Sequence, residues 1–279
     1  MRNRIIYTHY SGGEPKRQRR TRLPLRYLIV GSAIICAVAG AITLLRIDAL
    51  QIRTVTFAGV NSNSLNEATL RSSVLAELSG SRLLIFPRTS FFLANTSAIE
   101  KRLKTDFPRI ESVTAVKEFP FKIHISLVER TFWGVFCNGM AGSSTPACAY
   151  IDPHGIAYQA SAEPEGTLII SIHSDTRDDI HIGERVVDAS LMEELTVFSE
   201  KLPASANIHI ADFELHTRIP SEIRARTVDG FILIFKRGGD IASTLHVLKR
   251  VLESEIKDQR RRLDYIDLRF GNKVFYKLR

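Results

Sequence analysis

Two short segments of this chain hold residues whose types and spacing could perform chemistry. Ser254 and Lys257 form a Ser-x-x-Lys pair, which on a helix would place a lysine one turn from a serine nucleophile, as in penicillin-recognising enzymes. The Ser-Asp-Asn and Lys-Thr-Gly segments that complete such a site do not occur in the sequence. His154 stands two residues after Asp152, which suits an acid–base or metal-binding pair, but we favour the alternative of a solvated turn.

Other chemical signatures are missing from the sequence. It holds no phosphate-binding glycine loop, no His-Glu-x-x-His zinc motif and no calcium-binding loop. We therefore predict no catalytic residues, no cofactor and no metal site, and we expect a protein that is not an enzyme and has no small-molecule substrate. Its function should then depend on surfaces that bind other macromolecules.

Cys137 and Cys148 flank a segment rich in turn-forming residues. If the residues on either side form paired strands, the two sulfur atoms would meet across the loop, and an oxidising compartment would permit a disulfide. A pair of half-buried thiols is the alternative. No Cys-x-x-Cys motif or histidine pair accompanies them, so a zinc site is not predicted.

The net charge of the chain is concentrated in a short N-terminal tail. The formal charge of the chain is +8, and residues 1–26 hold eight basic side chains against one acid, so this tail carries seven of the eight charges. The rest of the chain has no excess of basic residues that would indicate a nucleic-acid-binding domain. With 44% hydrophobic and 24% charged residues, its composition is that of a folded protein.

Residues 27–45, YLIVGSAIICAVAGAITLL, contain no charged side chain. A helix of about 20 apolar residues is long enough to cross a bilayer, so we predict a single transmembrane helix here. The basic residues that precede it place residues 1–26 in the cytoplasm and the bulk of the chain outside the cell membrane. The Ala-Val-Ala segment at 37–39 leaves a cleaved signal peptide as an alternative, and Arg19-Arg20 leaves a twin-arginine signal as another.

Hydropathy patterns predict a first outer domain over residues 48–130. A Ser64-x-x-Glu67 capping box and a second one at Ser97 and Glu100 indicate the starts of two helices. Alternating apolar residues predict one strand before these helices and two after them. The predicted strands cover residues 52–58, 110–119 and 121–128, which gives a β-α-α-β-β order.

The second outer domain, residues 131–279, has the pattern of a mostly antiparallel sheet with flanking helices. Apolar residues at helical spacing predict helices over 189–202 and 241–259. Asp229-Gly230 between two alternating segments is typical of a hairpin turn, and Phe231, Leu233 and Phe235 are predicted to face one way. The last two strands, 263–270 and 274–277, are predicted to flank a Gly271-Asn272 turn. The predicted fold class is thus α+β, with one transmembrane helix followed by these two domains.

Several segments resemble the FtsQ/DivIB family of bacterial cell-division proteins. The string FPRIESVTAVKEFPFKIHISLVER, residues 107–130, resembles the end of the POTRA domain of that family, and Ile52-x-x-Val55-x-Phe57-x-Gly59 resembles its first strand. The Asp152-x-x-Gly155 step and the string IDLRF at 266–270 resemble its C-terminal β domain. The loop between the two cysteines departs from the family pattern.

The resemblance implies a non-enzymatic, single-span scaffold at the division septum that binds FtsB/FtsL-type partners through its β domain and helps regulate septal wall synthesis. Such partners would add a strand to the last strand of this domain. By position, the implied contacts are Arg269, Phe270, Gly271, Asn272, Phe275 and Tyr276. For Phe270 and for one of the last two aromatics, burial in the core is the alternative. A membrane-anchored POTRA protein of envelope assembly or secretion is the alternative function.

Overall fold

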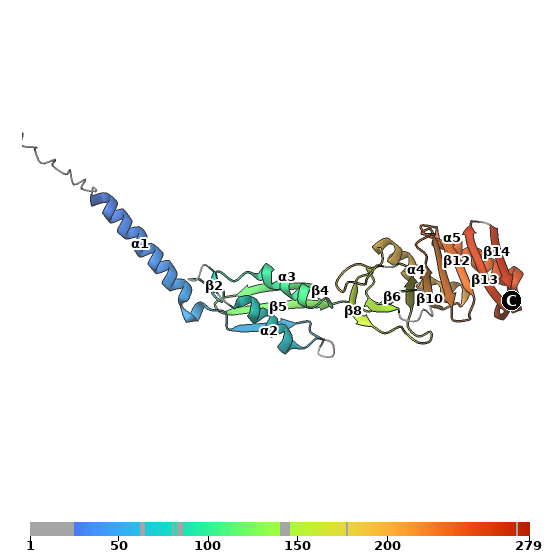
Figure 1. Cartoon of the computed structure of the whole chain (residues 1–279), viewed down its shortest axis with the longest axis horizontal. Coiled ribbons are helices and arrows are strands. Elements are labelled where there is room, and N and C mark those ends of the chain that lie inside the picture. The colour runs from blue at the N-terminus through green and yellow to red at the C-terminus, as the bar shows by residue number, and fades with distance from the viewer. Residues whose placement is uncertain are drawn as a thin grey trace, which may run out of the picture.

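The computed structural model of the chain shows helix α1 (Leu25–Arg46) at one end, a small three-stranded unit next to it, and a larger β-rich unit at the far end (Figure 1). Most of the predicted basic tail lies outside the described residues. The structure describes residues 25–61, 65–79, 81–82, 86–139, 146–176, 178–271 and 273–279.

Helix α1 coincides with the predicted transmembrane segment. Thr43 turns its hydroxyl back to the carbonyl oxygens of Ala39 and Gly40, at 3.1 and 2.8 Å. A spanning helix must combine a length of about 20 residues with a predominantly apolar composition. Within the described ranges of the chain, no helix combines the two well enough to cross a membrane. The predicted transmembrane helix over residues 27–45 is therefore corrected, and with it that part of the predicted fold class.

The small unit has the predicted β-α-α-β-β order, with a short additional hairpin of β2 and β3 between its two helices. Strand β1 pairs in parallel with β5, and β4 pairs with β5 in the antiparallel direction, so that the sheet order is β1-β5-β4. The elements are β1 Thr54–Ala58, α2 Glu67–Leu78, β2 Ser81–Arg82, β3 Phe86–Pro87, α3 Thr96–Asp106, β4 Ile110–Glu118 and β5 Lys122–Glu129.

Helices α2 and α3 pack against one face of this sheet. Alternate strand residues such as Val55, Ile123 and Ile125 are buried against apolar helix residues such as Leu70 and Leu103. Because strand side chains alternate between the two faces of a sheet, the hydroxyl and imidazole groups of the intervening residues lie on the open face. There the Thr56 hydroxyl and His124 Nδ1 are 3.0 Å apart.

The large unit is built on a nine-stranded sheet of order β14-β13-β12-β11-β10-β9-β6-β7-β8. Most neighbouring strands are antiparallel, but β6–β9, β9–β10 and β12–β13 are parallel. The strands are β6 Gly134–Asn138, β7 Ala147–Ile151, β8 Ala157–Ser161, β9 Ser171–Ser174, β10 Ile210–Leu215, β11 Glu222–Thr227, β12 Ile232–Lys236, β13 Leu263–Phe270 and β14 Lys273–Leu278.

One face of the large sheet packs against helices α4 (Ala189–Ala206) and α5 (Ile241–Val251), which continues as η2 (Leu252–Ile256) and η3 (Lys257–Arg262). The predicted alternation along residues 231–235 is confirmed, because Phe231, Leu233 and Phe235 are all buried in this core. The side chains of the opposite face include the charged residues Glu222, Arg224 and Arg226 of β11, which alternate with buried Ile223 and Ala225. This face is therefore polar, while the helix-covered face is apolar.

A buried ion pair joins the two units. Arg130, directly after β5, places Nη1 2.6 Å from Oδ2 of Asp152, and the side chain of Asp152 is only 2% exposed. The other carboxylate oxygen of Asp152 accepts hydrogen bonds from the backbone N–H groups of His154 and Ile156, each at 2.9 Å. The Asp152 carboxylate therefore holds both a turn and the junction between the units. The predicted turn is present, but Asp152 is buried in it rather than solvated.

Gly155 completes this turn because no other residue fits there. Its φ angle is +75°, in the left-handed region, and a Cβ atom would lie 2.2 Å from the carbonyl oxygen of Val187. A side chain at this position would therefore collide with backbone. The spacing of Asp152 and Gly155 in the sequence is explained by this one turn.

Replacing Asp152 with alanine should destabilise the protein by about 3–5 kcal/mol, because it leaves Arg130 and two backbone N–H groups without their partner. The free energy of unfolding from urea titration, followed by circular dichroism, measures this loss. Asp188→Ala is the matched control: its ion pair with Arg237 also has a distance of 2.7 Å, but the Asp188 side chain is 68% exposed. The control should cost about 1 kcal/mol or less. Equal losses in both variants would contradict the structural role of the junction pair.

Candidate partner-binding edge of the large sheet

Strand β14 forms one outer edge of the large sheet, at the end of the molecule farthest from α1 (Figure 1). It pairs with β13 in an antiparallel hairpin, with Ile266 opposite Tyr276 and Asp267 opposite Phe275. Gly271 begins the turn with φ +65°, a left-handed conformation that favours glycine. Asn272, the other predicted turn residue, lies outside the described residues.

The backbone of β14 alternates between its partner strand and solvent. The N–H of Arg279 donates to the carbonyl oxygen of Arg262 at 2.6 Å, so this group points toward β13. Because the direction reverses at each residue, Phe275 and Lys277 also point toward β13, while Val274, Tyr276 and Leu278 point outward. The described part of the chain places no strand on this side of β14. The outward N–H and C=O groups therefore form an open edge.

Three aromatic side chains lie exposed beside this edge. Phe270, Phe275 and Tyr276 are 53, 54 and 40% exposed. Phe270 and Phe275 contact each other edge to face, with ring centroids 5.4 Å apart. The guanidinium of Arg269 lies over the Phe270 ring, 5.4 Å from its centroid. The alternative in which Phe270 and a second aromatic are core residues is not observed, since all three reach the surface.

Arg269 is held by a network of ion pairs. Its Nη2 lies 2.6 Å from Oδ2 of Asp267, two residues earlier on β13. Its Nη1 contacts Glu222 of β11, whose other carboxylate oxygen lies 2.7 Å from Nε of Arg224. The network therefore ties β13 to β11 across β12. Glu222 was not predicted, because its partner comes from a strand far away in the sequence.

Burial and hydrogen bonding act in opposite directions on Asp267. Burial raises the pKa of its carboxyl group, but hydrogen bonds from the side chain and backbone N–H of Arg269 lower this pKa more, so that it lies below the ordinary 3.8. The hydrogen bond to Asp267 raises the pKa of Arg269 in turn. Both groups are therefore held in their charged forms at the base of the aromatic edge.

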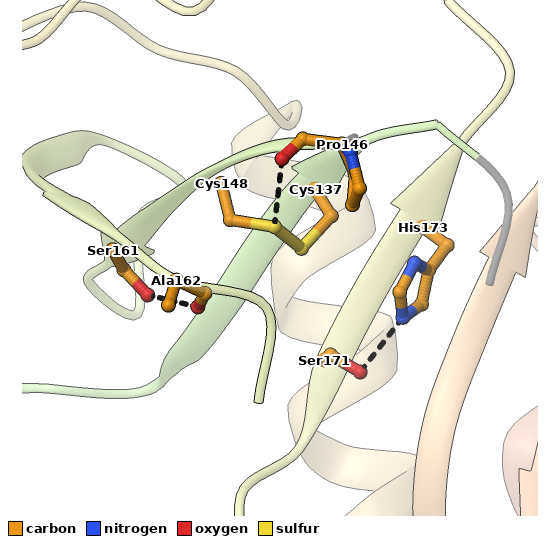
Figure 2. Close-up of a disulfide and its surroundings, with 7 residues drawn as sticks. All are labelled: Cys137, Pro146, Cys148, Ser161, Ala162, Ser171 and His173. Atoms are coloured by element: carbon orange, nitrogen blue, oxygen red, sulfur yellow. Dashed lines mark hydrogen bonds between the residues drawn. A yellow bond between two sulfur atoms is a disulfide. The ribbon is translucent and has the colours of Figure 1, made fainter. Parts of the chain in front are cut away.

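A disulfide joins Cys137 and Cys148 on the open face of the large sheet (Figure 2). The two cysteines are directly opposite each other in β6 and β7, with Cα atoms 4.1 Å apart, and both are buried. The alternative of two half-buried thiols is not what the structure shows. On the neighbouring strand β9, the Ser171 hydroxyl and His173 Nε2 are 3.0 Å apart.

The Ser-x-x-Lys pair does not form a site. The hydroxyl of Ser254 donates to the carbonyl oxygen of Arg250 at 2.8 Å, and no contact joins it to Lys257 among the described residues. Between them the helix changes from η2 to η3, and Lys257 has a positive φ of 48°. In the described ranges, no group of three or more His, Cys, Asp or Glu side chains could hold a metal ion.

Comparison with known proteins now places these features in a class. A parallel β1–β5 pair flanked by β4, with two helices on one face, has the architecture of a POTRA domain. Residues 50–130 match the POTRA domain of FtsQ type, which confirms the resemblance to the FtsQ/DivIB family. A search of curated proteins found no match. The match covers less than a third of the 279 residues and shows that the chain contains a POTRA domain of FtsQ type.

The charged network predicts a pH dependence of stability with a definite sign. Folding lowers the pKa of Asp267. Its ionised carboxylate therefore adds to the free energy of unfolding at pH values above 3.8, the pKa in the unfolded chain, and this stabilisation is lost as the pH falls through the lower pKa of the folded protein. We expect Asp267→Asn to be less stable than the parent chain at neutral pH, and this difference to shrink in acid. Urea titrations from about pH 7 down to about pH 3 measure it.

Asp212 of β10 is the matched control for this pH series. Burial raises its pKa, despite the opposing effect of Arg226. The pH dependence should therefore have the opposite sign to that of Asp267. Compared with Asp212→Asn, the parent chain should lose stability as the pH rises from 3.8 through the raised pKa of Asp212 in the folded protein. The same slope in both variants would show that the local environments do not control these carboxylates.

Proposed function

We propose that this protein is a non-enzymatic scaffold of the bacterial division machinery that acts at the division septum. In this proposal, it binds FtsB/FtsL-type partners through its β domain and helps regulate septal wall synthesis. The observation that carries the proposal is the open edge of β14 beside the exposed aromatic rings. An extended segment of a partner can add to such an edge through backbone hydrogen bonds, and side chains then determine which segment is accepted.

Two of the other sheet edges, those of β8 and β4, support the choice of β14. At the opposite edge of the large sheet, Gly183 N–H donates to the carbonyl oxygen of Ala157 at 2.7 Å, and Ala157 N–H donates to that of Glu184 at 2.9 Å. A loop thus covers part of β8. In the small sheet, the Glu100 carboxylate accepts the N–H of Ala115 on edge strand β4 at 2.7 Å. Both edges are protected against strand addition in the way that natural sheets manage exposed strands.

The aromatic side chains would contact an added strand on both of its faces. Successive residues of β14 point to opposite faces, so Phe275 lies on one side and Tyr276 on the other. Phe270 supports Phe275 through their edge-to-face contact. In this proposal Arg269 positions the aromatic rings and does not bind the partner directly, because its guanidinium is already bound to Asp267 and Glu222.

Tyr276→Pro should weaken binding of the extracytoplasmic segment of an FtsB-type partner by about tenfold or more. Proline removes an outward N–H donor, and its ring obstructs the approaching strand. The loss of one to two backbone hydrogen bonds is of this size. Isothermal titration calorimetry measures the affinity, and a thermal melt shows that the variant is folded. Tyr276→Ala is the control, since it removes the ring and keeps the donor. Unchanged affinity in a folded Tyr276→Pro protein would refute strand addition at this edge.

A cellular experiment tests the division role itself. A fluorescent fusion of the chain should form a band at mid-cell, and depletion of the native protein should give filaments because septation stops. Expression of the parent chain should restore division, whereas Tyr276→Pro should not. A uniform envelope signal with normal division after depletion would instead favour an envelope assembly or secretion factor.

A further inference from the structure

A group of exposed phenylalanines lies at the end of the small unit next to α1. Phe92, Phe119 and Phe121 are 53, 72 and 43% exposed. Phe119 and Phe121 belong to the turn between β4 and β5, while Phe92 belongs to the segment before α3. We call these three residues, with the half-buried Phe91 between them, the phenylalanine patch.

Backbone and ring contacts bring these segments together. Phe91 N–H donates to the carbonyl oxygen of Leu50, and the N–H of Arg53 donates to that of Phe121, both at 2.9 Å. The Phe91 ring contacts the rings of Phe92 and Phe119 edge to face, with centroids 5.7 and 5.6 Å apart. Three of the four rings are therefore in contact, and the backbone of Phe121 bonds to the segment that follows α1.

The phenylalanine patch is not part of the hydrophobic core of the small unit. None of its four rings belongs to the buried apolar cluster that α2 and α3 form with the sheet. Single exposed apolar side chains are ordinary, but a contiguous apolar patch on a soluble surface marks a site of interaction. Phe119 is the most exposed of the four and stands at the tip of a tight turn, so the patch protrudes.

Two cations border the patch. Lys117 donates from Nζ to the carbonyl oxygen of Phe91 at 2.9 Å, and its Nζ lies 5.7 Å from the centroid of the Phe91 ring. Arg53 is exposed. Within the part of the chain that the structure describes, neither side chain has an acidic partner, whereas Lys122 nearby is neutralised by Glu118 at 2.8 Å.

The surface of α1 continues this apolar character. Its exposed side chains include Ile29, Ile34 and Ile35. Helix α1 leads through the short turn η1 (Asp48–Leu50) directly into the segment that bonds to the phenylalanine patch. The backbone bonds of Phe91 and Arg53 therefore place the patch beside the segment that follows α1. Figure 1 shows α1 at this end of the molecule.

We propose that the phenylalanine patch rests on the surface of a lipid bilayer that contains anionic lipids. Aromatic rings on a protruding turn fit the boundary between headgroups and acyl chains, because this boundary accepts apolar side chains without a preformed pocket. Arg53 and Lys117 would then face lipid phosphates, to which nearby basic residues are attracted. The small unit would be held against the membrane at this end, and the β14 edge would point away from it.

The proposal is tested with tryptophan as a probe in the full-length chain. Phe119→Trp is mixed with vesicles of phosphatidylglycerol and phosphatidylcholine, with and without brominated acyl chains. The native Trp133 lies in the large unit, and the spectrum of the parent chain subtracts its emission. Val128→Trp is the matched control, because Val128 is 55% exposed near the end of β5 that lies away from the turn holding Phe119.

We expect the emission of Trp at 119 to shift to shorter wavelength with vesicles and to be quenched by brominated lipid, and that of Trp at 128 to do neither. Adding Arg53→Ala and Lys117→Ala to the Phe119→Trp chain should remove most of this quenching in anionic vesicles. Unquenched emission at 119 in chains that co-sediment with vesicles would overturn the proposal. A blue shift without vesicles would also overturn it, since the rings would then be covered by protein.

Discussion

The ion pair between Arg130 and Asp152 is the constraint on which the arrangement of the two units depends. Arg130 ends the small sheet, and its Nε also donates to the carbonyl oxygen of Pro108 at 3.0 Å, so the guanidinium is fixed on both sides. Asp152 lies in the turn that follows β7. The pair therefore joins the small unit to the end of the large sheet that holds β7 and β8. As a result, β14 is the strand farthest from the junction, and its outer edge remains open.

The junction also explains why two separate sequence motifs occur together. The Val-Glu-Arg segment at 128–130 and the Asp152-x-x-Gly155 step look unrelated in the sequence, but their charged side chains meet in the structure. Arg109 strengthens the same junction, with Nη1 2.9 Å from Oε1 of Gln159 and its guanidinium over the Tyr158 ring. A buried charge requires a partner of opposite sign, so each motif needs the other.

Local patterns predicted the elements, but they could not predict how distant strands pair. Alternation placed Phe231, Leu233 and Phe235 on the core face, as observed. The short strand β9 was missed, because all four of its residues are buried and show no alternation. Both predicted capping boxes were wrong. Asn66 caps α2 and Asn95 caps α3, and Glu100 binds the N–H of Ala115 instead. The donor that Glu100 binds lies on β4, and the sequence around Glu100 does not show that this strand is close.

In the candidate site, too, contacts within one strand follow from the sequence, whereas contacts between distant strands do not. The pairing of Asp267 with Arg269 follows from their spacing on one strand, whereas Glu222 joins them because β11 and β13 flank β12. For the disulfide, the sequence left two readings open, and the register that sets Cys137 opposite Cys148 decides between them. The exposure of Phe275 and Tyr276 likewise follows from the position of β14 at the edge of the sheet, and Phe270 lies beside them at the end of β13. If β14 lay between two strands, its alternate residues would be buried; at the edge, the same sequence presents aromatic rings and free backbone groups together.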